Sequence, residues 1–306
     1  MANDMAQSSI LLLGSNGQVG HELRTTLAPL GALIAVDFPD IDFTEPGPIL
    51  DIIRGHKPVA VVNAAAYTAV DKAESEKDKA YAVNAATPGK IAGACEEIGA
   101  CLVHYSTDYV FDGTKNGIYD EADITCPASE YGRSKRDGEI AVAGCFRHLT
   151  FRTSWVVGPH GHNFIRTMLR LAGERETLRV VGDQFGAPTS APMLAQVTAS
   201  VLAEMIGLPK SDRRWGLYHL VCGGETTWHG FAQHIVGRGA AAGLPLKARP
   251  DTIVAITTAE YPVPAKRPAN SRLSTSKISS TFGLSIPDWQ QAVDPVIDRI
   301  ISEIKG

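Results

Sequence analysis

The sequence has few cysteines, no excess of basic residues and no long apolar run, and each of these absences excludes a class of protein. Its five cysteines include no Cys-x-x-Cys pair and no zinc-like spacing, so we predict neither a disulfide scaffold nor a metal site. Most of them lie in apolar stretches, where a free cysteine behaves as a small hydrophobe. We interpret these as reduced core residues.

The charges are balanced rather than basic. The 306 residues include 29 Lys and Arg against 33 Asp and Glu, which gives a formal net charge of −4 at pH 7. Such a chain has no basic field to attract a phosphate backbone, so we expect no nucleic-acid partner. No stretch approaches about 18 consecutive apolar residues, and residues 1–9 lack a basic segment followed by an apolar one. We therefore expect a cytoplasmic protein without a membrane partner.

The sequence alternates short apolar runs with segments of helix length. Apolar runs that end in small or polar residues lie at 10–13, 32–36, 59–62 and 101–105. Helix-length segments lie between them at 18–28, 46–56 and 78–98. Strands that are apolar throughout and alternate with helices indicate a parallel sheet covered on both faces. The pattern predicts an α/β fold with a Rossmann-type doubly wound parallel sheet, which holds ligands at its carboxyl edge.

The second half of the chain has a different pattern. A helix at 131–143 and a strand at 148–153 continue the alternation, but after Trp155 the loops are richer in Gly and Pro. Further helices are expected near 163–172, 193–205 and 286–304. We predict a dinucleotide-binding Rossmann domain at 1–156. Residues 157–306 are expected to form mainly a smaller α/β substrate-binding lobe, interleaved with the first domain.

A glycine-rich turn at 14–20 follows the first apolar run and opens the first helix. Gly14 permits the tight turn, Gly17 lets the backbone approach a pyrophosphate, and Gly20 allows close packing of helix on strand. Free N–H groups at the start of the helix then bind the anion. The expected cofactor-binding residues of this turn are Gly14, Asn16, Gly17, Gln18 and Val19.

Asp37 ends the second apolar run, about 20 residues beyond the turn, where an acid can bind the ribose hydroxyls of adenosine. Taken alone, it favours NADH, because a carboxylate repels a 2′-phosphate. Arg24, in the first helix, can offset that charge or lie on the surface as a solvated residue. The sequence therefore leaves the choice between NADPH and NADH open.

Tyr131 and Lys135 are four residues apart, and Thr107 lies upstream in the run 105–109. On a helix this spacing places a phenol and an ammonium on one face, although ordinary solvated helices also contain such pairs. If both face a cleft, the ammonium lowers the pKa of the tyrosine from its reference of about 10, and the phenol can serve as a general acid or base.

Seven ordered motifs carry a resemblance to a known family. They are 13–20, 62–74, 104–111, 131–135, 152–155, 183–189 and 267–272. Together they resemble the extended short-chain dehydrogenase/reductase superfamily. Within it, the chain is most similar to the enzymes that reduce the C4 ketone of dTDP-6-deoxy-L-lyxo-4-hexulose. The resemblance implies NADPH or NADH as cofactor and a dTDP-sugar as substrate.

The resemblance also implies roles for individual residues. Tyr131 protonates the substrate oxygen, Lys135 holds the nicotinamide ribose and lowers the pKa of the tyrosine, and Thr107 takes the role of the more usual serine. Further cofactor contacts are expected from a segment that follows a strand, namely Asn63, Ala64, Ala65 and Ala66. The expected substrate-binding residues are Thr107, Asp108, Tyr109, Trp155, Asn163, Gln184, Pro188 and Arg267.

Three alternatives stay open at this point. Sugar-nucleotide 4,6-dehydratases share the fold but place a pair of acids after the threonine, whereas Asp108 is followed here by Tyr109. A 4-epimerase would keep its NAD bound and need no net reductant. A relative of these reductases is a non-catalytic regulatory subunit of methionine adenosyltransferase, although retention of all three catalytic side chains argues against that role.

Some members of the family dimerise around a magnesium ion held by glutamates. Glu22 matches the first such position, but the other two are Pro192 and Arg299, which carry no carboxylate. Magnesium prefers oxygen ligands, so we expect no metal bridge. The sequence predicts a monomer or a dimer that forms without metal.

Overall fold

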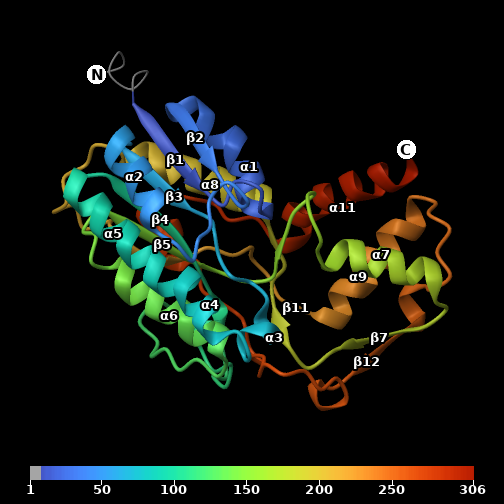
Figure 1. Cartoon of the computed structure of the whole chain (residues 1–306). Coiled ribbons are helices and arrows are strands. Elements are labelled where there is room, and N and C mark those ends of the chain that lie inside the picture. The colour runs from blue at the N-terminus through green and yellow to red at the C-terminus, as the bar shows by residue number, and fades with distance from the viewer. Residues whose placement is uncertain (1–7) are drawn as a thin grey trace.

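The computed structural model describes residues 8–306 and contains a six-stranded parallel sheet, as predicted (Figure 1). Its strands stand in the order β10-β5-β4-β3-β1-β2. Their bounds are β1 Ser9–Leu13, β2 Ala32–Val36, β3 Ala60–Asn63, β4 Cys101–Thr107, β5 His148–Thr153 and β10 Gly216–His219. Leu13 pairs with both Val36 and Asn63, so the last residues of three adjacent strands meet at the carboxyl edge.

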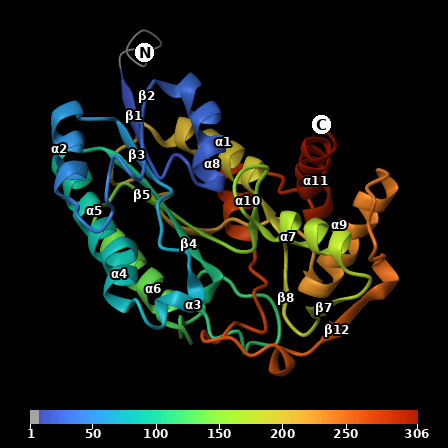
Figure 2. The same ribbon diagram turned by 45° about the vertical axis from the view of Figure 1, so that its right-hand side comes forward.

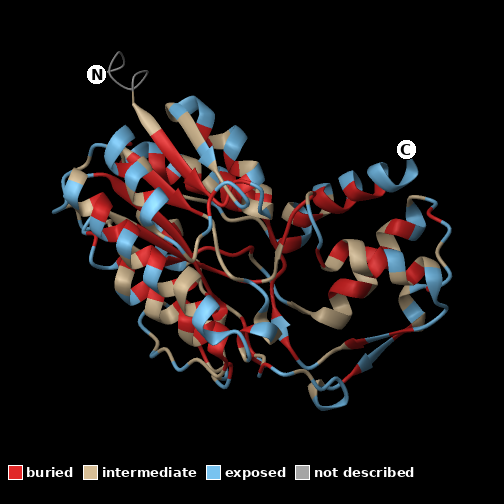
Figure 3. Ribbon diagram, viewed as in Figure 1, coloured by how far each residue is buried: buried red, intermediate tan, exposed pale blue. Residues whose placement is uncertain are grey.

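Helices cover both faces of this sheet because successive side chains of each strand point to opposite faces. Ile10 and Leu12 of β1 belong to the core under α1 (Gln18–Leu27) and α8 (Ala191–Met205). Leu11 and Leu13 belong to the core under α2 (Gly47–His56), α5 (Thr87–Ile98) and α6 (Glu130–Val142). Strands β1, β3, β4 and β5 are accordingly buried over almost their whole length (Figure 3).

The predicted helix at 78–98 is interrupted. After the short helix α3 (Val70–Ala73), the chain forms α4 (Lys77–Tyr81), then a π-helix at Ala82–Ala86, and then α5. The prediction of one continuous helix was therefore wrong in its middle. Buried Asn84 lies in the π-helix and binds the Tyr67 backbone and the Ser134 side chain. A π-helical turn inserted between α-helices is frequently found at a functional site.

In the second lobe, helix α9 (Trp228–Ala241) packs against a small sheet and against two further helices (Figure 2). These helices are α7 (Phe164–Glu174) and α11 (Trp289–Lys305), and in the sheet β7 (Leu178–Val181) pairs with β12 (Ile253–Ile256). Helix α9 was not expected from the sequence. The remaining short elements are β6 (Val156–Val157), β8 (Phe185–Gly186), β9 (Thr189–Ser190), β11 (Thr226–Thr227) and α10 (Ser276–Phe282).

The two lobes share chain segments. Strand β10 lies beyond residue 156 yet pairs with β5, and helix α8 packs on α1. The segment 267–272 returns to the first lobe between β12 and α10, where Tyr119 forms a β-bridge with Leu273. Within residues 8–306, no helix is both long and apolar enough to span a membrane.

Candidate active site

The glycine turn has the geometry that close approach of a phosphate requires. Gly14 has a φ of 78°, and a Cβ there would overlap the backbone of Ala65. A Cβ on Gly20 would overlap the carbonyl oxygen of Gly14, so α1 can approach the strand only because residue 20 has no side chain. Gly17 caps α1 with extended backbone, and its N–H donates to the Gly14 oxygen. The turn therefore opens a helix N-terminus toward a ligand.

Asp37 and Arg24 both contact this turn. The Asp37 carboxylate accepts from the Asn16 N–H at 2.6 Å and from the Phe38 N–H at 2.7 Å. The Arg24 guanidinium donates to the Ser15 hydroxyl and to the Asn16 side-chain oxygen, each at 2.8 Å. A carboxylate and a guanidinium thus flank Asn16.

A cleft of about 900 Å³ extends along the carboxyl edge of the sheet from this turn. All the predicted cofactor residues except Asn63 line it, namely Gly14, Asn16, Gly17, Gln18, Val19, Asp37, Ala64, Ala65, Ala66, Tyr131 and Lys135. Asn63 is buried beneath the cleft, where its Oδ1 accepts from the Ala65 N–H at 3.2 Å. It shapes the Ala64–Ala66 turn from below. These residues fit a dinucleotide because Gly14 and Gly20 lack the Cβ atoms that would keep the turn from packing against its neighbours, and the turn is what lets a phosphate approach the helix.

Helix α6 carries the predicted tyrosine and lysine, and two glycines bring it close to the site. Ser129 caps it by accepting from the Gly132 N–H at 3.1 Å. A Cβ on Gly132 would overlap the carbonyl oxygen of Tyr109, and one on Gly138 would overlap that of Asn84. This close packing places Tyr131 next to η4 (Asp108–Val110), and the rings of Tyr109 and Tyr131 meet edge to face at 5.4 Å.

Lys135 lines the cleft but is almost fully buried. Its Nζ donates to the carbonyl oxygen of Tyr105 at 2.6 Å, and 2% of the residue is exposed. Burial lowers the pKa of Lys135 to about 8, although the Glu139 carboxylate acts in the opposite direction. Glu139 is itself held by a buried ion pair with Arg152 at 2.8 Å. The ammonium is therefore still mostly charged at pH 7 and poised close to its titration point.

The structure contradicts the expected direction of the Tyr131 pKa. Burial raises the pKa of this phenol above its usual 10, and the Asp108 carboxylate raises it further, while the neighbouring Thr107 hydroxyl acts in the opposite direction. The predicted lowering by Lys135 does not occur, because the ammonium binds the Tyr105 carbonyl instead. Tyr131 is consequently held as a neutral phenol, which is the form that can donate a proton.

Thr107 and Asp108 form a buried polar cluster beside Tyr131. The Thr107 hydroxyl donates to Oδ1 of Asp108 at 2.9 Å and accepts from the Tyr109 N–H at 3.2 Å. Oδ2 of Asp108 accepts from the Ser271 hydroxyl at 2.5 Å. Burial raises the pKa of Asp108 to about 6 despite these hydrogen bonds. The cluster thus joins β4 to a segment 163 residues further along the chain.

Trp155 lies between the lobes rather than in the cleft. Its φ of 48° is in the left-handed region, which a bulky residue rarely adopts. The indole stacks on Trp228 at 3.8 Å between ring centres, and a Cβ on Gly186 would lie 2.8 Å from it. The strained backbone thereby directs Trp155 across the junction of the two lobes.

The other predicted substrate residues are spread over the same junction. Arg267 donates to Asp71 at 2.8 Å, while its Nε is buried and has no hydrogen-bond partner among residues 8–306. Gln184 donates to Thr258 at 3.1 Å, and Pro188 is buried. Asn163 caps α7 and donates to the Gly158 oxygen at 2.7 Å. Of these, Arg267 retains a free donor that could bind an anion.

Two site residues were missed by the sequence reasoning. Ser271 lies within a motif that had been noted, but nothing in the sequence relates it to Thr107. Asn84 supports the Tyr67 turn and Ser134, whose hydroxyl donates to the Tyr131 carbonyl at 2.8 Å. The sequence did contain one indication of the role of Asn84, because this asparagine lies in an otherwise apolar helical stretch. In the described part of the chain, no cluster of three or more His, Cys, Asp or Glu side chains could hold a metal ion.

Known proteins resemble this chain over nearly its whole length. The family model for the RmlD substrate binding domain matches residues 8–302. The dTDP-4-dehydrorhamnose reductase of Escherichia coli strain K12 is 47% identical over 299 residues, which cover 96% of this chain and 98% of that protein.

Two solved structures agree with this similarity. The crystal structure of a dTDP-4-dehydrorhamnose reductase from Clostridium acetobutylicum has a TM-score of 0.86 at 36% identity, covering 95% of this chain and 98% of that one. The enzyme of the same name from Bacillus anthracis, in complex with NADP, has a TM-score of 0.85 at 32% identity, covering 97% and 99%.

Proposed function

The chain belongs to the family of dTDP-4-dehydrorhamnose reductases, and we propose that its Thr107, Tyr131 and Lys135 carry out the reduction. The reaction converts dTDP-6-deoxy-L-lyxo-4-hexulose into dTDP-L-rhamnose with NADPH or NADH, the reduction step of dTDP-rhamnose biosynthesis. The observation that supports the residue assignment is the neutral, buried Tyr131 phenol beside Thr107 at the edge of the cofactor cleft.

Tyr131 is the proposed proton donor. When bound, the nicotinamide cofactor supplies the hydride that the C4 carbon of the sugar accepts. The C4 oxygen then needs one proton, and a phenol whose pKa is raised by burial still carries its proton at neutral pH. Thr107 contributes a hydroxyl that can hydrogen-bond the same oxygen. Lys135 supplies a positive charge below the cleft, which favours the negative charge that develops during proton donation.

We propose that the cofactor lies along the turn at Gly14–Gly20 and the Ala64–Ala66 segment, beneath which Asn63 supports the backbone. On the substrate side, the assignment extends to Asp108, Tyr109, Trp155, Asn163, Gln184, Pro188 and Arg267. Arg267 is the proposed diphosphate contact because a guanidinium binds phosphate oxygens in pairs and its Nε has no partner in the described chain. Asp71, its present partner, would then share the guanidinium with the substrate.

The proposed roles of the two domains follow from the fold. Residues 1–156 form the dinucleotide-binding domain and residues 157–306 form mainly the substrate lobe, with β10 and α8 returning to the first domain. We also place the protein in the cytoplasm, which agrees with five free cysteines and with a nucleotide cofactor. It acts as a monomer or as a dimer without a metal bridge.

The direct test is a stoichiometric assay of the purified chain. We expect one NADPH or NADH to be consumed for each dTDP-L-rhamnose formed from the C4 keto-sugar. A dehydratase or an epimerase would form product without net consumption of reductant. A regulatory subunit would form none. Either result would overturn the assignment.

A further inference from the structure

Thr107 has a hydrogen-bond arrangement that does not suit its proposed role unless its neighbour carries a proton. A hydroxyl has one hydrogen to donate and two lone pairs to accept. One lone pair of Thr107 accepts from the Tyr109 N–H. In the arrangement of the structure, the single hydrogen is directed to Oδ1 of Asp108. Because a ketone oxygen can only accept, Thr107 has no hydrogen left to offer the substrate.

A proton on Asp108 reverses this arrangement. The carboxyl then donates from Oδ1 to the second lone pair of Thr107, and the Thr107 hydrogen becomes free to turn toward the C4 oxygen. This works only if the proton sits on Oδ1 rather than Oδ2. Ser271 favours Oδ1, because Oδ2 is the only acceptor that its buried hydroxyl hydrogen has among residues 8–306, and a proton on Oδ2 would leave that hydrogen without a partner.

We propose that Ser271 and Asp108 are positioning residues for Thr107: the serine confines the carboxyl proton to Oδ1, and that proton aims the Thr107 hydrogen at the C4 oxygen of the substrate. The inference rests on the proposed function of Thr107 and goes beyond it. It assigns the active form of the enzyme to a protonated Asp108.

Ser271 is held firmly enough to make this choice. It is 4% exposed, and its N–H donates to the Phe185 carbonyl at 2.7 Å. The preceding Asn270 donates to the carbonyl oxygens of Lys115 and Gly117 at 2.8 and 2.6 Å. The serine is thereby fixed to both lobes. Its backbone cannot move away from Asp108 without breaking these bonds.

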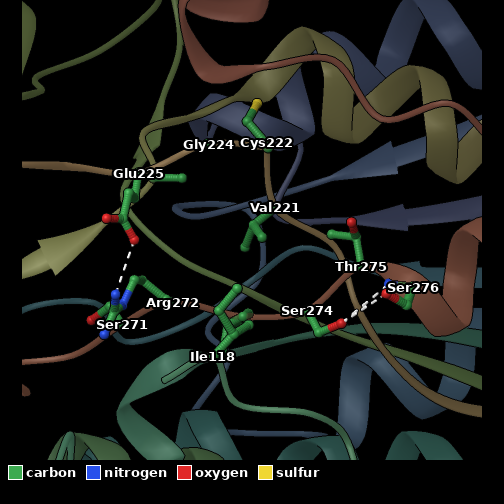
Figure 4. A pocket seen from close by; sticks show the side chains of 13 residues that line it. Ile118, Val221, Cys222, Gly224, Glu225, Ser271, Arg272, Ser274, Thr275 and Ser276 are labelled. Atoms are coloured by element: carbon green, nitrogen blue, oxygen red, sulfur yellow. Dashed lines mark hydrogen bonds and ion pairs between the residues drawn. The ribbon is translucent and has the colours of Figure 1, made fainter. Parts of the chain in front are cut away.

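Ser271 also lines a cavity of about 240 Å³, in which its neighbours are paired with one another (Figure 4). Arg272 binds Glu225 at 3.0 Å, and the Ser274 hydroxyl donates to that of Ser276 at 3.1 Å. Ser274 therefore lines the same cavity and lies three residues away, but it is bonded away from the catalytic cluster. It provides a matched control.

The surroundings of Asp108 make its carboxyl easier to protonate than a solvated one. Burial raises its pKa to about 6, and none of the causes of that shift is a charged side chain. The titratable groups that face it are Tyr109 of η4 and Tyr131 of α6, both neutral phenols whose pKa its charge raises. From the 267–272 segment it meets the uncharged Ser271. A sugar nucleotide bound nearby brings negative charge and excludes water, and both raise the pKa of Asp108 further.

The test compares the pH dependence of reduction in the wild type with that in Ser271→Ala, Asp108→Asn and Ser274→Ala, from about pH 5 to about pH 9. In the wild type, kcat/KM falls as pH rises through the pKa of Asp108, and a second decline near pH 8 belongs to Lys135. Asp108→Asn has no group to titrate, so we expect the first decline to disappear and the second to remain.

Ser271→Ala has a separate signature. Loss of the donor destabilises the carboxylate, so the first decline moves to higher pH. At low pH, kcat falls about tenfold with KM nearly unchanged, because the proton is no longer confined to Oδ1. Ser274→Ala matches the wild type. Thermal unfolding and NADPH binding are measured for every variant to establish that each is folded.

The outcomes distinguish failure of the proposed function from failure of the proposed roles of Asp108 and Ser271. If the wild type forms no dTDP-L-rhamnose, the proposed function fails. If it does, but the first decline persists in Asp108→Asn or keeps its position in Ser271→Ala, then Asp108 is not the titrating group and the inference is overturned. A Ser271→Ala variant that loses only thermal stability would also overturn it, since a merely structural serine predicts that result.

Discussion

In the catalytic site, the Tyr131 phenol carries the proton and the Lys135 ammonium carries the positive charge. Tyr131 and Lys135 form no hydrogen bond with each other, since Lys135 donates to the Tyr105 carbonyl. Burial keeps the Tyr131 phenol neutral. For a reductase that is the useful resting state, because the substrate oxygen takes a proton rather than giving one.

Replacing Tyr131 tests this arrangement directly. We expect Tyr131→Phe to lower kcat by about 10²- to 10⁴-fold, the usual contribution of a general acid. The binding of NADPH, measured by fluorescence titration, should change little because the ring is kept. Tyr81→Phe is the control, since Tyr81 lies on α4 and its hydroxyl contacts only Glu130 among the described residues. Near-normal turnover by Tyr131→Phe would remove the tyrosine from the mechanism.

Lys135 gives a stability prediction with a definite sign. Its pKa is about 8 in the folded chain against 10.5 for an unperturbed lysine, so between these pH values the unfolded state binds more protons. The free energy of unfolding therefore rises with pH over this window, by an amount on the order of 3 kcal/mol. We expect the difference between wild type and Lys135→Met, measured by urea unfolding, to grow in favour of wild type from pH 8 to pH 10. A difference in unfolding free energy that stays constant between pH 8 and pH 10 would refute the lowered pKa of Lys135.

Asp37 sets a prediction for cofactor preference. Its carboxylate lies at the Asn16 backbone, where a 2′-phosphate would meet a like charge, while Arg24 lies on the other side of Asn16. We expect Asp37→Asn to lower the KM for NADPH relative to that for NADH, by about tenfold for a close charge pair. Asp40→Asn, exposed and outside the cleft, is the control. An equal change for both cofactors would show that Asp37 does not discriminate.

At the scale of elements, the site depends on how closely α6 and the π-helix approach each other. Gly132 and Gly138 leave no room for a side chain against Tyr109 and Asn84. Asn84 then binds the Tyr67 backbone and Ser134, which holds α6 to the Ala64–Ala66 side of the cleft. The tyrosine is positioned by backbone contact rather than by its own side chain.

We expect Gly132→Ala to destabilise the fold by about 1–3 kcal/mol, the usual cost of overpacking, and to lower kcat because Tyr131 shifts. Gly93→Ala in α5 is the matched control, since nothing lies within 4 Å of the new methyl group. That change should stabilise the helix by about 0.5–1 kcal/mol. Chemical denaturation with parallel rate measurements would check both. Equal effects of the two substitutions would contradict close packing as the cause.

Sequence reasoning succeeded where local pattern determines structure. The runs at 32–36 and 148–153 became strands with those bounds, and the apolar runs at 10–13, 59–62 and 101–105 lie in or next to strands β1, β3 and β4, which are buried on both faces of the sheet. It failed where tertiary contacts determine the local structure. The π-helix that contains Asn84 was not predicted. Helix α9 was missed because glycines and histidines interrupt its apolar face. For the site, Tyr131 and Lys135 were visible from spacing, whereas Ser271 becomes adjacent to Asp108 only after folding.

At the scale of the whole molecule, the two lobes meet through several chain crossings and not through one linker. The Trp155–Trp228 stack, the β10–β5 pairing and the 267–272 segment each join them. The catalytic cluster takes Thr107 from one lobe and Ser271 from a segment shared by both. The relative position of the lobes therefore enters the chemistry directly.

The assembly state gives a further prediction. Arg299 lies near His160 at 3.2 Å and pairs with Glu303, and Pro192 offers no carboxylate, so Glu22 would have to bind magnesium alone. We expect the mass measured by solution scattering, and the reduction rate, to be the same with magnesium and with a chelator. A dimer that appears only with magnesium would refute this.

The pairing of β10 with β5 has a consequence for how the protein is made. Strand β5 ends at residue 153, but its outer edge stays unpaired until residues 216–219 have been synthesised. During translation, the nascent chain therefore exposes a strand edge while more than sixty further residues emerge from the ribosome. Exposed edges can pair with other chains. Prompt emergence of the Gly216–His219 segment would thus protect the newly made protein from aggregation.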